Sequence, residues 1–180
     1  MDVWRVTAER GFLMAADPLP DPVAEAEGAR DALAEISAAA ADLPALVASG
    51  AVREVAAALP VPDLDRAGLS ARAAERLHQI YAYLANGHLW TPAARERTRR
   101  LPAALAIPFV ALSDRLRRPP VLSYTHSQLG NWRRATPEGR LDDPEALRPI
   151  QTFQDDPEEA WFWVIHIAIE AAGGPAAIAG

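Results

Sequence analysis

The sequence predicts an all-α fold, and three observations support this. Half of the 180 residues are hydrophobic, which is enough to bury a core. Apolar residues recur at intervals of three and four along several segments, which is the periodicity of amphipathic helices. The sequence shows neither an alternating pattern of useful strand length nor an internal repeat. We therefore expect helices throughout, with at most a minor hairpin.

The first predicted element is an extended arm over residues 1–22. Closely spaced prolines at its end remove hydrogen-bond donors and restrict the residues before them. An Ala-rich helix is predicted over residues 23–41, where apolar residues are spaced as on one helical face, and Pro44 and then Gly50 mark its end. A short helix over residues 51–59 should follow.

The clearest amphipathic pattern covers residues 69–84. Asp63 or Asp65 is a candidate cap for the helix that follows them. The dipeptide Asn86-Gly87 is a typical stop signal, so we expect the helix to end there.

Two more helices are predicted before a polar loop. Residues 103–116 are helical in pattern, with a kink expected at Pro108, and a further helix is expected over residues 121–134. The loop TPEGRLDDPEA then contains many turn residues.

The last predicted helix begins at Pro157, with Glu158 and Glu159 in the first turn, where the helix dipole favours negative charge. Its sequence AWFWVIHIAIEAA is apolar on nearly every side, which is typical of a helix that is buried all round. No later segment of this sequence covers its second face. We therefore expect a partner, a ligand or further sequence to do so.

The composition excludes several classes of protein. The chain has no cysteine, so disulfides, thiolate nucleophiles and zinc fingers are ruled out. Early charges and the lack of ~20 uninterrupted apolar residues argue against a signal peptide and a membrane partner, so we expect a cytoplasmic protein. The net charge is -6, and acidic residues dilute the basic runs Arg95–Arg100 and Arg115–Arg118, so we expect no nucleic-acid partner.

Several short motifs follow one another along the chain. They are GFL (11–13), DPLP (17–20), DLPAL (42–46), LPAALAIPF (101–109), LRRPPVLSY (116–124), LGNWR (129–133) and EEAWFWVIHIAIEA (158–171). Each is weak alone, but PPVLSY and NWR followed by WFWVIHIAIEA are specific in combination. In this order the sequence resembles the amino-terminal region of the indoleamine 2,3-dioxygenase family.

The resemblance implies a smaller helical domain plus the first helix of a larger domain that holds haem b. On this basis residues 1–22 are an arm, residues 23–155 the small domain, and residues 156–180 the start of a truncated haem domain. The family reaction inserts both atoms of O2 across the C2–C3 bond of the tryptophan indole and gives N-formylkynurenine. The iron, rather than a protein nucleophile, activates the oxygen.

The resemblance also assigns binding residues. Tyr124, Ser127 and Gln128 match positions on the distal side of the haem, near the indole ring. Phe162 and Trp163 match an aromatic pair that packs against it. Tyr124, Ser127 and Phe162 are the expected cofactor contacts, and no residue of this chain is an expected metal ligand.

His166 is the expected catalytic residue. It matches a position that is Ser in mammalian indoleamine enzymes, and the related tryptophan 2,3-dioxygenases have a distal His. The resemblance implies that it forms a hydrogen bond with the indole N–H. Phe162 and His166 are four residues apart and so share a helical face, and a neutral imidazole offers one acceptor. The alternative is a core histidine satisfied by a backbone carbonyl.

The other candidate groups have plainer interpretations. His78 and His88 are expected to face solvent, and His126 to point away from the haem. The aromatic run 161–163 has ordinary core packing as its alternative. The acidic residues within 155–159 are expected in a solvated loop and a first helical turn rather than in a metal site.

The axial His of the family lies beyond the region matched here, so we expect this chain alone not to be a competent dioxygenase. Two partner arrangements stay open beside the indole substrate and O2: a second chain that supplies the proximal His, and a homo-oligomer. The alternative function is a non-catalytic helical domain, or a half-enzyme, that binds a partner chain through its exposed apolar last helix.

Overall fold

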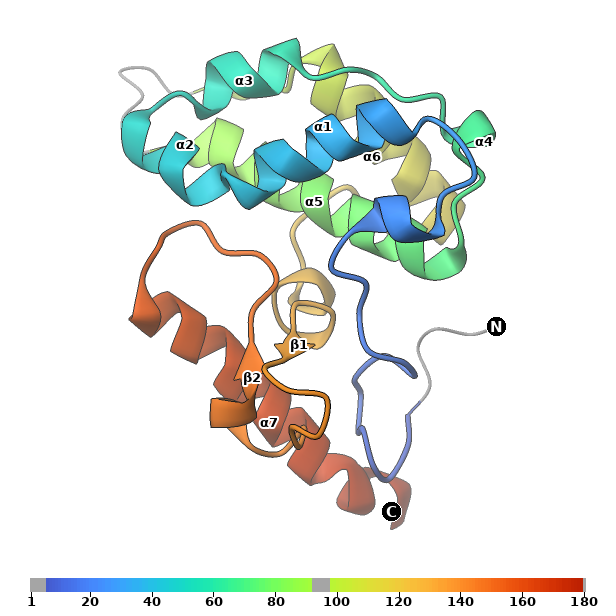
Figure 1. Ribbon diagram of the computed structural model, residues 1–180, viewed down its shortest axis with the longest axis vertical. Coiled ribbons are helices and arrows are strands. Elements are labelled where there is room, and N and C mark those ends of the chain that lie inside the picture. Colours follow the sequence, from blue (N-terminus) through green and yellow to red (C-terminus); the bar gives the residue numbers. More distant parts are fainter. Residues whose placement is uncertain (1–5, 92–97, 180) are drawn as a thin grey trace. The chain divides into compact units, whose positions relative to one another are not determined.

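The computed structural model describes residues 6–91 and 98–179 (Figure 1). Residues 95–97 of the first basic run and the first five residues of the predicted arm lie outside this range. The chain divides into two compact units. We call the described residues of Asp21–Leu122 and Thr152–Asp155 the bundle unit. Those of Met1–Pro20, Ser123–Gln151 and Asp156–Gly180 form the α7 unit.

The bundle unit is helical, as predicted. Its elements are η1 (Pro22–Glu25), α1 (Arg30–Ala41), α2 (Leu43–Ser49), α3 (Val52–Ala58), α4 (Leu64–Ala67), α5 (Ala71–Trp90) and α6 (Ala103–Leu116). The prediction for residues 103–116 is confirmed, with Pro108 inside the helix. Asp63 caps α4 by accepting from the backbone of Asp65 and Arg66, whereas Ser70 caps α5.

The predicted helix over residues 23–41 is interrupted. A 3-10 turn, η1, precedes α1, and residues 26–29 between them are not helical. The backbone N–H groups of Glu27 and Gly28 donate to the carbonyl of Ala67, at 2.8 and 3.1 Å. Because these amides pair with α4, they are not available for helical bonds. A tertiary contact therefore shortens a helix that local composition favours.

α5 is the central helix of the bundle unit, and α1, α2, α3 and α6 pack against it. It continues to Trp90, so the predicted stop at Asn86-Gly87 is wrong. A Cβ atom at Gly87 would lie 2.9 Å from Leu43 Cδ1 and 3.3 Å from Val52 Cγ2. Gly87 thus allows α2 and α3 to approach α5 closely, and its role is packing rather than termination.

Both histidines of α5 are buried, which corrects the expectation that they face solvent. His78 Nε2 lies 2.9 Å from Ser113 Oγ, and its ring packs against Phe109 with centroids 4.9 Å apart. His88 lies in the last turn of the helix rather than in a loop. Because other helices pack against several sides of α5, little of its surface is left for water. The position of His78 on the flank of the helix therefore did not predict whether the side chain is exposed.

The α7 unit combines short elements with one long helix. They are η2 (Thr125–Leu129), β1 (Arg133–Arg134), η3 (Pro144–Ala146), β2 (Leu147–Arg148) and α7 (Pro157–Ala179). Before η2, residues 6–20 form turns and a bridge between Thr7 and Gly11. β1 and β2 pair antiparallel, with Arg133 opposite Arg148, which is the minor hairpin allowed for above.

The helix predicted over residues 121–134 is largely absent. Only the wide turn of η2 forms, and the chain then becomes extended. Asn131 provides the reason: its side chain accepts from the N–H of Gln151 and donates to the carbonyl of the same residue, both at 2.8 Å. A side chain that mimics a strand partner competes with the helix for the local backbone.

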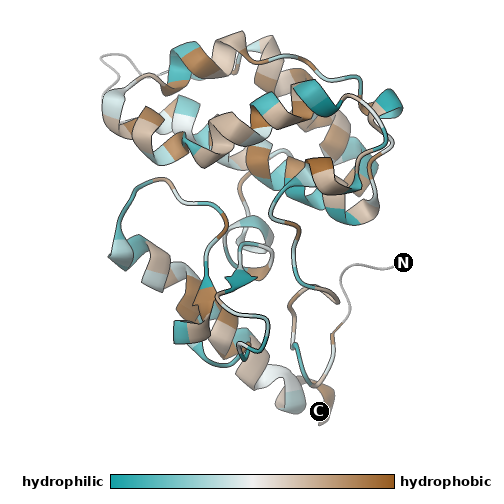
Figure 2. Ribbon diagram, in the orientation of Figure 1, coloured by the Kyte–Doolittle hydropathy of each residue, from teal (hydrophilic) through white to brown (hydrophobic). Residues whose placement is uncertain are grey.

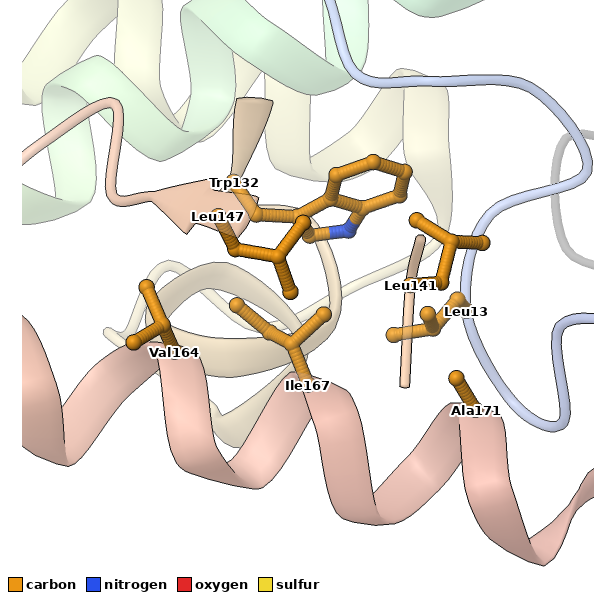
Figure 3. Close-up of a cluster of buried hydrophobic side chains, with 7 residues drawn as sticks. All are labelled: Leu13, Trp132, Leu141, Leu147, Val164, Ile167 and Ala171. Atoms are coloured by element: carbon orange, nitrogen blue, oxygen red, sulfur yellow. The ribbon is translucent and has the colours of Figure 1, made fainter. Parts of the chain in front are cut away.

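The core of the α7 unit forms around Trp132, which is fully buried. Figure 3 shows side chains from the arm, the hairpin region and α7 converging on its indole ring. The surrounding residues are Leu13, Leu141, Leu147, Val164, Ile167 and Ala171. Trp132 Nε1 donates to the carbonyl of Leu129 at 3.0 Å, so its one polar group is satisfied.

Two arginines flank this tryptophan, and one carboxylate joins them. The guanidinium carbons of Arg10 and Arg134 each lie 6.0 Å from the Trp132 ring centroid. Asp17 accepts from Arg10 Nη2 at 2.9 Å and from Arg134 Nε at 2.7 Å. This cluster connects the arm to the hairpin across the outer edge of the core.

Within this chain α7 buries one face, as expected for an apolar helix whose second face no segment of this sequence covers. Val164, Ile167, Ala168, Ala171 and Gly174 point inward. The helix is hydrophobic along much of its length (Figure 2), yet about half of the surface of Trp161 and Phe162 is exposed. The predicted uncovered apolar face is therefore present.

By length and composition, α7 is the one single helix in the described part of the chain that could cross a membrane. α1 and α2 would qualify only as one span with a bend of 58°. The core helices of many proteins pass the same test, so this observation carries little weight.

The burial of His78 predicts a pH dependence of stability. Burial and then the Arg118 charge lower its pKa from 6.5 to about 4. The unfolded chain therefore binds the extra proton first, and the free energy of unfolding should fall by up to ~3 kcal/mol as the pH drops from about 6.5 to 4. Urea unfolding across this range, on wild type and H78Q, measures the effect. If the free energy of unfolding changed with pH in the same way in wild type and H78Q, the prediction for His78 would be contradicted.

A second pH dependence should arise from Asp17. Burial raises its pKa, but the hydrogen bonds and charges of Arg134 and Arg10 outweigh this and lower it below 3.8. The stabilisation is present above that pH and is lost as the pH falls through the folded-state value. D17N should cost about 1 kcal/mol at pH 7, and this cost should shrink as the pH falls through the folded-state pKa of Asp17.

The exposed pair of Arg140 and Asp142, 2.6 Å apart, provides a matched control for D17N. D142N removes the same charge from a salt bridge in water, so urea unfolding should detect no change. Equal effects of the two substitutions would show that Asp17 acts only through the net charge.

Candidate functional site

Three side chains of α7 form a row on the face that the core leaves uncovered. Phe162, His166 and Glu170 are spaced by four residues and therefore lie one turn apart along the helix. Phe162 is half-exposed, whereas His166 and Glu170 are partly buried. The row thus presents an aromatic ring, an imidazole and a carboxylate in sequence.

Tyr124, just before η2, lies across this row. Its hydroxyl donates to Glu170 Oε1 at 3.0 Å, and its ring meets the His166 ring edge-on with centroids 6.3 Å apart. Burial, then the hydrogen bond to Glu170 and its charge, raise the pKa of Tyr124 to about 12. The phenol therefore remains protonated at neutral pH and continues to donate to the carboxylate.

The backbone sets the orientation of the His166 ring. Nδ1 lies 2.6 Å from the carbonyl oxygen of Phe162, and because a carbonyl only accepts, we assign the proton to Nδ1. In the neutral ring Nε2 is then an acceptor. The Phe162 and His166 rings meet at 63° with centroids 4.7 Å apart. The alternative interpretation of His166 was a core histidine satisfied by a backbone carbonyl. The hydrogen bond to a carbonyl is present, but the imidazole is only partly buried and does not belong to the core.

Trp163 lies beside the row and supports it. Its ring packs edge-on against Phe162, with centroids 5.0 Å apart and an interplanar angle of 70°. Its Nε1 donates to Glu159 Oε1 at 3.0 Å, one turn earlier on α7. Trp163 is therefore partly buried and held by its own helix.

Ser127 and Gln128 are buried within η2. The Ser127 hydroxyl lies within hydrogen-bond distance of two acceptors, the carbonyl oxygen of Ser123 at 3.1 Å and Gln128 Oε1, and its single proton serves one of them at a time. His126, also buried, places its Nδ1 3.0 Å from Ser123 Oγ. These hydrogen bonds lie inside the turn. Of the predicted site residues, Phe162 and His166 therefore belong to the exposed row and Tyr124 lies across it.

The exposed rings and the four histidines differ in how well they suit a haem. Rings at an exposed apolar face suit one side of a flat aromatic macrocycle. Of the four histidines, His78, His88 and His126 are buried, and His166 alone has a ring that is partly accessible. Within residues 6–91 and 98–179, no group of three or more His, Asp or Glu side chains could hold a metal ion. The exposed rings therefore suit one wall of the group.

The acidic residues at the start of α7 have structural roles. Asp156 accepts from the N–H of Glu158 at 2.8 Å, and Glu159 accepts from Trp163. These are first-turn interactions of a helix, in agreement with the expectation of a solvated helix start.

Sequence reasoning missed Glu170. Its spacing of four residues from His166 was visible in the motif HIAIE, but a glutamate on an apolar helix has no special pattern of its own. Only the hydrogen bond from Tyr124, which is distant in sequence, connects this carboxylate to the aromatic row.

Comparison with known proteins gives a consistent result. The family model described as "Indoleamine 2,3-dioxygenase" matches residues 1–179. The chain is 30% identical to indoleamine 2,3-dioxygenase 1 of Mus musculus over 159 residues, which are 88% of this chain and 38% of that protein. Identity to indoleamine 2,3-dioxygenase 2 of the same organism is 30%, covering 96% and 40% respectively.

The indoleamine 2,3-dioxygenase of Saccharomyces cerevisiae is also 30% identical, over 74% of this chain and 30% of that protein. The chain thus spans less than half of the length of the curated relatives that it matches. The family match extends over nearly the whole of it, including the residues of the exposed row. This chain belongs to the indoleamine 2,3-dioxygenase family.

Proposed function

We propose that this chain forms one wall of the substrate site of a haem-dependent dioxygenase that acts on indoles. The observation that carries the proposal is the exposed row on α7, in which His166 presents Nε2 as an acceptor between the rings of Phe162 and Tyr124. An indole is a flat apolar ring with one N–H donor. The row matches both features, since it offers aromatic surface and one neutral acceptor.

In this proposal His166 accepts the indole N–H and so fixes the rotation of the substrate in its plane. Phe162 and Tyr124 cover the ring and exclude water, and Trp163 keeps Phe162 in place. Ser127 and Gln128 form the floor behind Tyr124 and keep the backbone of η2 rigid. Orientation by a group that is already positioned lowers the entropic part of the barrier.

Haem b, when bound, supplies the chemistry that activates O2. Both oxygen atoms then enter the C2–C3 bond of the indole, so that tryptophan gives N-formylkynurenine and no other reductant is needed. We assign binding and orientation to this chain, with Tyr124, Ser127 and Phe162 nearest the cofactor. The axial histidine comes from outside these 180 residues, through further sequence or a second chain.

A second candidate function is a non-catalytic helical domain that binds a partner chain. The observation that favours it is the extent of the uncovered face of α7, where Trp161, Phe162, Ile169 and Ile178 are each about half-exposed or more. A partner subunit or a second copy of this chain would bury these side chains. A complex with a second chain that supplies the proximal histidine would agree with both candidate functions.

We further propose that the protein works in the cytoplasm. The sequence has no cysteine that would form a disulfide in an oxidising compartment, and one apolar helix that packs on its own core is weak evidence for a membrane span.

The proposal predicts that His166 contributes to indole binding. The purified chain is mixed with hemin and with free imidazole, which stands in for the axial ligand, and L-tryptophan is titrated while the Soret band is recorded. Tryptophan should shift the band, and H166A should weaken tryptophan binding about two- to tenfold, the usual effect of losing one hydrogen bond. In an assembled enzyme the same change should lower the rate.

I178A, which removes an exposed apolar side chain from the far end of the same helix, is the matched control and should leave the titration unchanged. A band that tryptophan does not move would contradict an indole site. Equal effects of H166A and I178A would contradict the role of His166.

A further inference from the structure

We propose that part of the arm is a strap that holds a hinge near the end of α7 closed, and that it thereby sets the Tyr124–Glu170 contact at one end of the exposed row. The strap is the short loop Thr7–Gly11, and the hinge is the run Gly173–Pro175. The inference goes beyond the proposed function, because it concerns how one end of the row is held and does not depend on what binds there.

The first step concerns the weakness of α7 at the hinge. Glycine and proline are the residues least suited to the interior of a helix, and Gly173–Pro175 places three of them in succession. Pro175 has no N–H, so the carbonyl of Ala171 lacks its helical partner. Sharp bends in helices occur at such positions. Each described residue of α7 beyond Gly174 is exposed, so side-chain packing does not hold the last turn in place.

The second step concerns the contact that does hold it. Gly174 is the last buried residue of α7, and the backbone of the arm covers it. A Cβ atom at Gly174 would collide with the carbonyl oxygen of Ala8 and would lie 2.8 Å from the N atom of Gly11. A Cβ atom at Gly11 would in turn collide with the carbonyl oxygen of Glu170, one turn earlier. Backbone therefore meets backbone at the hinge, where the arm loop lies beside the last turns of α7 (Figure 1).

The third step concerns how the strap is fastened. The N–H of Gly11 donates to the carbonyl of Thr7 at 2.8 Å, and the N–H of Thr7 donates to the carbonyl of Gly11 at 3.2 Å, so the loop is closed on itself. The Arg10 side chain donates to the carbonyl of Met14 at 3.3 Å and to Asp17 at 2.9 Å, which ties the loop to the rest of the arm. None of these bonds involves α7, so the strap can be loosened without a change in the helix.

The fourth step connects the hinge to the exposed row. The carbonyl of Glu170 lies against the strap, and the side chain of the same residue accepts from the Tyr124 hydroxyl at 3.0 Å. With the strap released, a bend at the hinge would move the turn that carries Glu170, and the contact with Tyr124 would move with it. Hinges absorb such changes over a few residues, which are often small. The strap therefore keeps this end of the row in the geometry described above.

Two glycine substitutions one residue apart test the strap. A Cβ atom at Gly173 would meet nothing within 4 Å, whereas one at Gly174 would collide with the arm. Both G173A and G174A raise helix propensity, so propensity alone predicts slower hydrogen exchange of the amides of residues 176–179 in each variant. We expect G173A to slow this exchange and G174A to speed it about three- to tenfold, with the amides of residues 164–168 as the internal reference.

R10Q loosens the strap from the arm side and is the second variant, because G174A is the harsher change. It should speed exchange of the amides of residues 176–179 about two- to fivefold against the same internal reference. R140Q removes an arginine from the exposed pair with Asp142 and is the matched control, so it should leave the exchange unchanged. Both G174A and R10Q should also shift the NMR signals of the Tyr124 ring, whereas G173A and R140Q should not.

Three outcomes would overturn the inference. The strap is excluded if G174A slows exchange as G173A does, or if R10Q leaves the exchange of residues 176–179 unaltered. The link to the exposed row is excluded if the Tyr124 signals stay fixed while that exchange rises. Each of these measurements is made on the full chain without a ligand, so its result is independent of the indole titration that tests the proposed function.

Discussion

The α7 unit depends on the packing of one face of α7 against Trp132. A helix this apolar could bury any of its sides, and the residues that approach it decide which one is used. Val164, Ile167 and Ala171 turn towards the indole ring, and the arm adds Leu13 to the same cluster. Once this face is buried, the row that contains Phe162 and His166 must point outward, because helical geometry allows no other direction.

The arm and α7 approach one another more closely than side chains would allow. A Cβ atom at Gly11 would lie 2.0 Å from the carbonyl oxygen of Glu170, and one at Gly174 would lie 2.4 Å from that of Ala8. Gly11 also has a positive φ of 55°, which few other residues adopt without strain. Two glycines at one crossing therefore allow the arm to cover the helix just beyond the exposed row.

Neighbouring groups of the protein position the polar side chains of the exposed row. The Phe162 carbonyl sets the tautomer of His166, and Tyr124 positions the carboxylate of Glu170. Side chains that are held in this way would lose little conformational freedom if a ligand bound to them. The uncovered apolar surface around it is what a flat ligand or a partner chain would bury.

The sequence by itself determined the helical class, the positions of α3, α6 and the start of α7, the family, and the aromatic and histidine residues of the row. These features follow from local periodicity, capping and motif order, which act over a few residues. The excess of apolar residues on α7 also indicated that one of its faces would lie uncovered, but it did not indicate which one.

Only the tertiary structure decided where α5 ends, where α1 begins and which histidines are buried. Gly87 is a stop signal in isolation, but α2 and α3 pack over it and the helix continues. The pairing of Glu27 with Ala67, and of Asn131 with Gln151, likewise replaces local preference with a distant partner. Glu170 joined the site in the same way, because the hydroxyl that binds it lies 46 residues earlier in the chain. Such contacts depend on which segments meet in space, and no local pattern records them.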